Sequence, residues 1–294
     1  MTTTTQEVTT TTQEIKPGMS LKALMQTKTI RARFEEVLGK KSAGFMSSIV
    51  TATSQNKHLA KAEPMSIISA AAIAASLDLP INPSLGLAYI VPYGDKAQFQ
   101  IGWKGFVQLA LRSGQYETIN AARVYEGQLT KFDPFTGDME FNAEAKKSDK
   151  VTGYLLYFRL LNGYRKYFYM TREQAEAHGK RFSQTFKKGF GVWVDDFDSM
   201  ALKTVVKLGL AKFGPLSIEM QTAFETDQAT IKNDGTPEFI DAEAIFDNGS
   251  EDSGKALEPA QVQTLTDLAA QATGGKKKDK TTKDPLPYEP GAEG

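Results

Sequence analysis

The most restrictive feature of the sequence is a pair of β-prone runs, residues 151–161 and 165–170, joined at Asn162-Gly163. Asn-Gly between two such runs favours a tight hairpin, because both residues tolerate the positive φ angles of the turn. Thr171 and Gln174 follow at the spacing of a capping box, which predicts that a helix begins directly after the second strand. The segment therefore predicts a strand–turn–strand–helix unit and a fold that mixes sheet with helix.

Further elements are predicted on both sides of this unit. Helices are predicted over residues 20–53, 64–77, 103–112 and 194–213, and strands over 87–91, 97–101, 119–125 and 139–141. A glycine-punctuated basic loop is expected over residues 180–191. The class is therefore α+β: a central antiparallel sheet of about five strands that includes the hairpin, with helices packed against it.

Composition divides the chain into three parts. Residues 1–18 are Thr-rich and polar and are predicted to be disordered, whereas residues 19–224 carry the periodic helix and strand patterns. Residues 225–294 are acidic and poor in aromatics, which predicts a flexible tail with a small helical element. We expect no membrane span and no signal peptide, since neither a long apolar run nor a basic leader is visible. The absence of cysteine excludes disulfides and thiolate metal sites and fits a cytoplasmic protein.

The net charge of zero averages two unlike regions. Residues 1–214 hold 28 Lys and Arg against 19 Asp and Glu, whereas residues 215–294 hold 7 against 16. A basic body of this kind is typical of proteins that bind a polyanion. A mixed, solvated surface followed by an acidic tail explains the charge equally well.

The sequence lacks the motifs of several enzyme classes. It contains neither a G-x-x-x-x-G-K-[ST] phosphate loop nor a G-x-G-x-x-G dinucleotide fingerprint, so no motor for ATP-driven strand exchange is visible. Asp195, Asp196 and Asp198 are a conceivable magnesium site for a nuclease. Because they lie where a helix is predicted to begin, carboxylates there are also explained by the helix N-terminus. The chain is predicted not to be an enzyme.

Two helices carry cations at spacings that suit nucleic acid. Lys104, Gln108 and Arg112 fall at i, i+4 and i+8 on the helix that Trp103 begins, and so form one polar stripe. Lys203 and Lys207 share a face of the long helix. Cations pair with phosphates and aromatic rings stack on bases, which is how single strands are bound without regard to sequence. A lysine stripe is also explained as a solvated helix face.

Three separated segments resemble the RecT family of phage recombinases. The first runs from Ser76 to Tyr93 and contains Leu85-Gly86, Ala88-Tyr89 and Pro92-Tyr93. The second covers residues 99–105 and 109–116, and the third covers Trp193, residues 200–207, Lys212-Phe213 and residues 216–219. The match spans about residues 20–225, in order. The sequence has Val206-Lys207 where some relatives carry two adjacent cations, and Trp103-Lys104 where others have Tyr-Arg.

The resemblance implies a single-strand DNA annealing protein that works without ATP and assembles into rings or helical filaments on DNA. It implies a fold related to that of eukaryotic annealing proteins, with a sheet-and-helix core that lines a positively charged groove. No cofactor is implied as required, and Mg²⁺ is a candidate ion in the annealed DNA complex. The implied partners are single-stranded DNA, the annealed duplex, further copies of the chain, a phage 5′→3′ exonuclease and the host single-strand-binding protein, all in the cytoplasm of a bacterial host.

Carried over by position, the resemblance makes residues 19–224 the DNA-binding, annealing and oligomerisation domain. The residues predicted to contact DNA are Gln100, Trp103, Lys104, Arg112, Lys203 and Lys207. Arg123 is added from its position on a predicted strand. An adaptor that acts through the acidic tail is the remaining alternative to annealing and to a metal-dependent nuclease.

Overall fold

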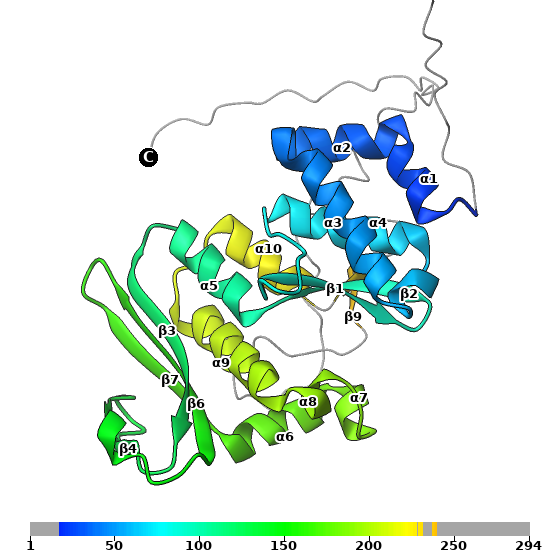
Figure 1. Ribbon diagram of the computed structural model, residues 1–294. Helices are drawn as coiled ribbons and strands as arrows, with labels where there is room; N and C mark the ends of the chain where they lie inside the picture. Colours follow the sequence, from blue (N-terminus) through cyan, green and yellow to red (C-terminus); the bar gives the residue numbers. More distant parts are fainter. Residues whose placement is uncertain (1–17, 228, 232–236, 240–294) are drawn as a thin grey trace, which may run out of the picture.

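The computed structural model describes residues 18–227, 229–231 and 237–239 (Figure 1). The predicted disordered N-terminus, except Gly18, and most of the predicted tail lie outside these residues. The fold is α+β, as predicted, and every strand pairing in the described residues is antiparallel. Among these residues, no helix is both long enough and apolar enough to cross a membrane.

The first part of the fold is a layer of helices. They are α1 (Leu21–Gln26), α2 (Lys28–Leu38), α3 (Ser42–Gln55) and α4 (Pro64–Ser76), with short 3-10 helices at Gly39–Lys41 and Leu59–Lys61. The sequence predicted one helical stretch before α4, but local hydrogen bonds divide it. The buried Thr27 hydroxyl donates to the carbonyl of Leu24 and accepts the N–H of Ile30, so that it closes α1 and caps α2. Gly39 ends α2 with a φ of 53°.

The helical layer covers a hairpin of β1 (Ala88–Tyr93) and β2 (Lys96–Ile101), where the sequence predicted a strand pair (Figure 1). Helix α5 (Trp103–Arg112) follows with the predicted bounds and buries Phe106, Leu109 and Ala110. The junction requires small residues, because a Cβ on Gly105 would lie 2.2 Å from the carbonyl oxygen of Leu87.

The largest sheet has three strands, β3 (Tyr116–Tyr125), β6 (Val151–Leu160) and β7 (Arg165–Thr171), in the order β3-β6-β7. The predicted hairpin is confirmed as β6 and β7. The expected sheet of about five strands is wrong, because β1–β2 and a third pair, β4 (Leu129–Phe132) and β5 (Met139–Phe141), form hairpins of their own. Helix α5 separates β2 from β3 in the chain, which leaves β1–β2 to pack mainly against α4.

The second helical part begins at the predicted capping box, where Thr171 and Gln174 bond reciprocally at the start of α6 (Arg172–Phe182). The predicted basic loop, residues 180–191, instead contains the end of α6 and the short helix α7 (Gln184–Lys187). After it, the helix predicted over residues 194–213 is divided, and the short helix α8 (Val192–Asp195) precedes its main part. Helix α9 (Phe197–Phe213) lies along one face of the three-stranded sheet (Figure 1). Gly209 permits this approach, because a Cβ there would meet Leu156 at 2.7 Å.

The described body continues past residue 224. Helix α10 (Ile218–Thr226) ends two residues later, Asp227 is buried, and the backbones of β8 (Ala229–Ile231) and β9 (Pro237–Phe239) pair with each other. The predicted start of the tail at residue 225 therefore falls inside α10.

Candidate nucleic-acid interface

Two of the predicted DNA contacts, Lys203 and Lys207, lie in the interior on one face of α9. Their side chains are 6% and 2% exposed, and their Nζ atoms lie 3.0 and 2.9 Å from the two carboxylate oxygens of Asp227. Oδ1 of Asp227 also accepts the backbone N–H of Ile101 at 3.0 Å. The carboxylate thus ties α9 and β2 to the segment after α10. These lysines hold the fold together in this structure, which differs from the groove position that the sequence predicted.

Arg112 closes the C-terminal end of α4. Its guanidinium donates hydrogen bonds of 2.7 Å to the carbonyl oxygens of Leu77 and Asp78. The last carbonyls of a helix have no partner within the helix, so a cation placed there satisfies them. Lys41 reinforces this corner through an ion pair of 2.8 Å with the Asp78 carboxylate. Arg112 is exposed as a residue, but its hydrogen-bonding groups are directed at the backbone.

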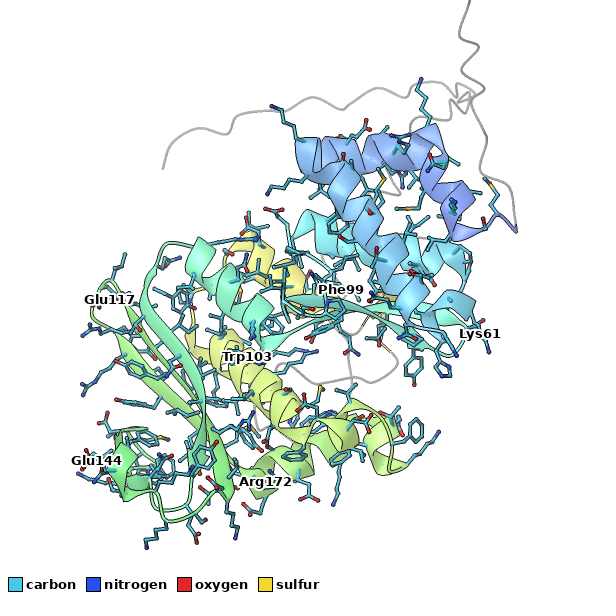
Figure 2. The ribbon with its side chains drawn as sticks, in the orientation of Figure 1. Lys61, Phe99, Trp103, Glu117, Glu144 and Arg172 are labelled. Atoms are coloured by element: carbon cyan, nitrogen blue, oxygen red, sulfur yellow. The ribbon has the colours of Figure 1, made fainter. Side chains whose placement is uncertain are left out.

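Trp103 and Lys104 form a cation–aromatic pair at the start of α5, where Figure 2 labels the tryptophan. The Nζ of Lys104 lies 5.8 Å from the Trp103 ring centroid, within the range of a cation–π contact. Trp103 is half-buried against the core, whereas Lys104 is exposed. The predicted pair therefore offers a charge and part of an aromatic surface to solvent.

Gln100 lies beside Gln98 on the same face of β2, as the alternation predicted, with Nε2 of Gln100 3.5 Å from Oε1 of Gln98. Both amides line a pocket of about 370 Å³. The pocket lies between the β1–β2 hairpin and residues 179–193, with Met200 of α9 and Asn56 also lining it. Its aromatic lining comes from Tyr93, Phe182, Phe190 and Trp193.

Arg123 belongs to a charged cluster that the sequence did not reveal as a whole. Asp198 accepts Arg123 on one carboxylate oxygen and Arg172 on the other, each at 3.2 Å, and the hydroxyl of Tyr154 donates to it at 2.5 Å. Arg172 also lies over the ring of Phe197, at 4.4 Å from its centroid. Figure 2 labels Arg172 where α6 leaves the sheet.

The cluster leaves a net positive charge near the surface, because one carboxylate faces two guanidinium groups that are 46% and 42% exposed. Burial, followed by the hydrogen bond to Asp198, raises the pKa of Tyr154 above its ordinary value of 10.0. The tyrosine therefore remains a hydrogen-bond donor at neutral pH. Strand register is the signal that leads to Arg172, since Arg123 and Met170 both pair with Tyr154 and Arg172 follows two residues later.

Two of the three aspartates of the nuclease alternative, Asp196 and Asp198, have other partners. Asp196 caps α9 by accepting the N–H of Ser199 at 3.2 Å, and Asp198 is held by the two arginines. Across residues 18–227, where side chains are described, no group of three His, Cys, Asp or Glu side chains is placed to hold a metal ion. The helix-terminus interpretation therefore accounts for Asp196, and ion pairing accounts for Asp198.

A mixed α+β body that carries exposed cations beside aromatic rings is typical of proteins that bind single-stranded nucleic acid. The comparisons with known proteins agree with this class. The chain matches the model of the RecT family over residues 43–241, and it belongs to that family. Membership places it among the proteins that bind DNA and anneal single strands in phage recombination.

Two relatives show the extent of the similarity. The chain is 46% identical over 248 residues to "Uncharacterized protein YqaK" of Bacillus subtilis (strain 168), which covers 84% of this chain and 86% of that protein. It is 30% identical over 205 residues to "Protein RecT" of Escherichia coli (strain K12), which covers 66% of this chain and 75% of that protein.

Proposed function

We propose that the protein binds single-stranded DNA and anneals complementary strands without ATP, as an oligomer, during phage homologous recombination in the bacterial cytoplasm. The family match over residues 43–241 carries this proposal. Binding and positioning of strands, not bond cleavage, are its chemistry. A phage 5′→3′ exonuclease would expose the strand, and this exonuclease and the host single-strand-binding protein are the expected partners of the protein.

The exposed cations support a specific set of DNA contacts. Lys104 with Trp103 at the start of α5, and Arg123 with Arg172 at Asp198, are the groups we assign to the strand. Arginines held by a carboxylate are already oriented, so less side-chain entropy is lost when they bind a phosphate. Each cation that contacts a phosphate releases counterions, whereas the Trp103 ring offers an apolar surface to a base.

The first experiment is annealing of two complementary labelled oligonucleotides without nucleotide, with strand length followed in the same reaction. Acceleration with intact strands is the expected result. Strands that shorten in the presence of magnesium would instead favour the nuclease. If the protein neither accelerates annealing nor shortens the strands, an adaptor that acts through the acidic tail becomes the favoured function.

The assigned cations are tested through the salt dependence of single-strand binding. Lys104→Ala and the pair Arg123→Ala with Arg172→Ala should each reduce the slope of log K against log salt, by about 0.7 for every phosphate that is no longer neutralised. Lys22→Ala, which removes an exposed lysine from α1, is the matched control and should leave the slope unchanged. Parental slopes in both test variants would show that these cations do not bind DNA.

A further inference from the structure

The loop between β4 and β5 holds Phe135 out in solvent. Phe135 is 97% exposed. Asp133 organises the loop: its carboxylate accepts the N–H of Phe135 at 2.9 Å and of Thr136 at 3.4 Å, and its carbonyl accepts the N–H of Gly137 at 2.8 Å. The N–H of Asp133 in turn bonds to the carbonyl of Asp138 at 3.0 Å. The aromatic ring is therefore presented on a hydrogen-bonded turn.

A single exposed apolar side chain is ordinary on a protein surface, but an aromatic ring fixed on a protruding turn has the properties of an interface anchor. Little conformational entropy is lost when such a ring is buried, because the backbone that carries it is already ordered. Phe132, at the end of β4, is also exposed and adds apolar area next to the turn.

The pocket beside β2 has the shape and lining to receive an aromatic ring. Its volume of about 370 Å³ lies at the lower end of the range for pockets that bind small organic groups. Phe182, Phe190 and Trp193 supply flat apolar walls, and Val192 is an exposed apolar residue of the lining. The pocket is therefore an apolar recess that includes exposed hydrophobic residues.

Charge is complementary between the two sites. Residues 133–138 carry two aspartates and no cation of their own, and the ammonium of Lys166 on β7 lies beside Gly137. In contrast, exposed cations lie next to pocket-lining residues in the chain: Lys57 follows Asn56, Arg181 precedes Phe182, and Lys187 and Lys188 lie between Thr185 and Phe190. An acidic turn with an aromatic tip matches an aromatic recess with a basic surround.

We propose that Phe135 of one copy of the chain inserts into this pocket on a second copy. The contact is heterologous, because the tip and the recess are different parts of the surface. Repetition of such a contact produces a ring where the rotation closes and a filament where it does not. The proposal rests on the oligomeric part of the proposed function and adds the two surfaces that would meet.

The experiment uses the full chain without DNA, with particle mass measured by sedimentation velocity over a range of concentrations. Phe135→Ser removes the tip, and Phe190→Glu places a charge in the recess. Each variant should weaken assembly by about 30-fold or more, the effect of a hot-spot residue. Leu161→Ser, which changes an exposed residue outside both surfaces, is the matched control and should assemble like the parent.

Mixing the two defective variants gives the sharper test. Phe135→Ser retains the recess and Phe190→Glu retains the tip, so a mixture should form a dimer that grows no further. Because the chain has no cysteine, Thr136→Cys, which keeps the Phe135 ring, and Val192→Cys can also be introduced as the sole thiols, and a mixture of these variants should cross-link with a short bismaleimide.

Full assembly by Phe135→Ser, or no dimer in the mixture, would overturn the proposal. A parent that remains monomeric both without DNA and with a complementary pair of oligonucleotides added would overturn it together with the oligomeric part of the proposed function. If Phe190→Glu assembles normally but loses affinity for single-stranded DNA, the recess takes a nucleobase and not Phe135. The annealing assay is run in parallel on the parent protein. If the parent anneals strands but these tests fail, the proposed contact is wrong and the annealing function stands.

Discussion

The buried cluster of Lys203, Lys207 and Asp227 provides the most stringent test of the structure. Asp227→Asn keeps the size of the side chain but removes its negative charge, and leaves two ammonium groups in the interior. Removal of one partner from a buried ion pair costs about 3–5 kcal/mol, because the remaining charge is neither solvated nor compensated. The bond to the N–H of Ile101 also becomes weaker, since its acceptor is no longer charged.

A loss of about 3–5 kcal/mol is large beside the 5–15 kcal/mol that typically stabilises a folded domain. Urea unfolding followed by circular dichroism, with the midpoint and slope fitted together, measures it. Lys203→Met should cost less than Asp227→Asn, because one lysine and one aspartate then remain as a balanced pair. Glu225→Gln, an exposed change on α10, is the matched control and should leave the free energy of unfolding unchanged.

The same variants distinguish a structural role from DNA contact. If Lys203 contacted phosphate at the surface, Lys203→Met would reduce the salt slope and leave stability unchanged. A loss below about 1 kcal/mol in Asp227→Asn, within the range of an ordinary hydrogen bond, would refute the structural role of the buried cluster. So would an equal loss in Asp227→Asn and Lys203→Met.

Three further predictions concern the scaffold of the site. Gly105→Ala should destabilise the protein by about 1–3 kcal/mol in urea unfolding, because the new Cβ would lie 2.2 Å from the Leu87 carbonyl oxygen; unchanged stability would show that the junction relaxes freely. Thr171→Ala should cost about 1 kcal/mol, seen as a fall of about 2–4 °C in melting temperature, because α6 loses its N-cap. Arg112→Ala should lower stability but leave the salt slope of DNA binding at the parental value, since its guanidinium bonds to backbone carbonyls; a reduced slope would restore Arg112 to the residues that bind DNA.

Local sequence signals determined most of the secondary structure. Asn162-Gly163 specified the β6–β7 hairpin, Thr171 with Gln174 specified the start of α6, and the periodicity of residues 103–112 specified α5 and its buried face. Each signal acts within a few residues, through backbone conformation or capping, so it holds whatever surrounds the segment. The family resemblance likewise depended on sequence alone, and the comparisons confirm it.

The candidate site depended much more on tertiary structure. The i, i+4 spacing placed Lys203 and Lys207 on one face of a helix, but spacing does not say whether that face meets solvent or the interior. Asp227 decides this, from a position 20 residues after Lys207 that composition assigned to the tail. A buried lysine requires a counter-ion within a few ångströms, and only the folded chain brings one there.

The division of the strands among separate sheets and the Arg123 cluster also depend on contacts between segments that are distant in the chain. Alternation identified strands but not their partners, so strands that belong to separate sheets in the structure were expected to form one sheet. Arg172 joins Arg123 at Asp198 because three segments, β3, the start of α6 and the start of α9, converge there. The sequence by itself determined which residues form helices and strands, because those preferences are local. The tertiary structure decided which cations are exposed, because burial and ion pairing depend on residues that are distant in the chain.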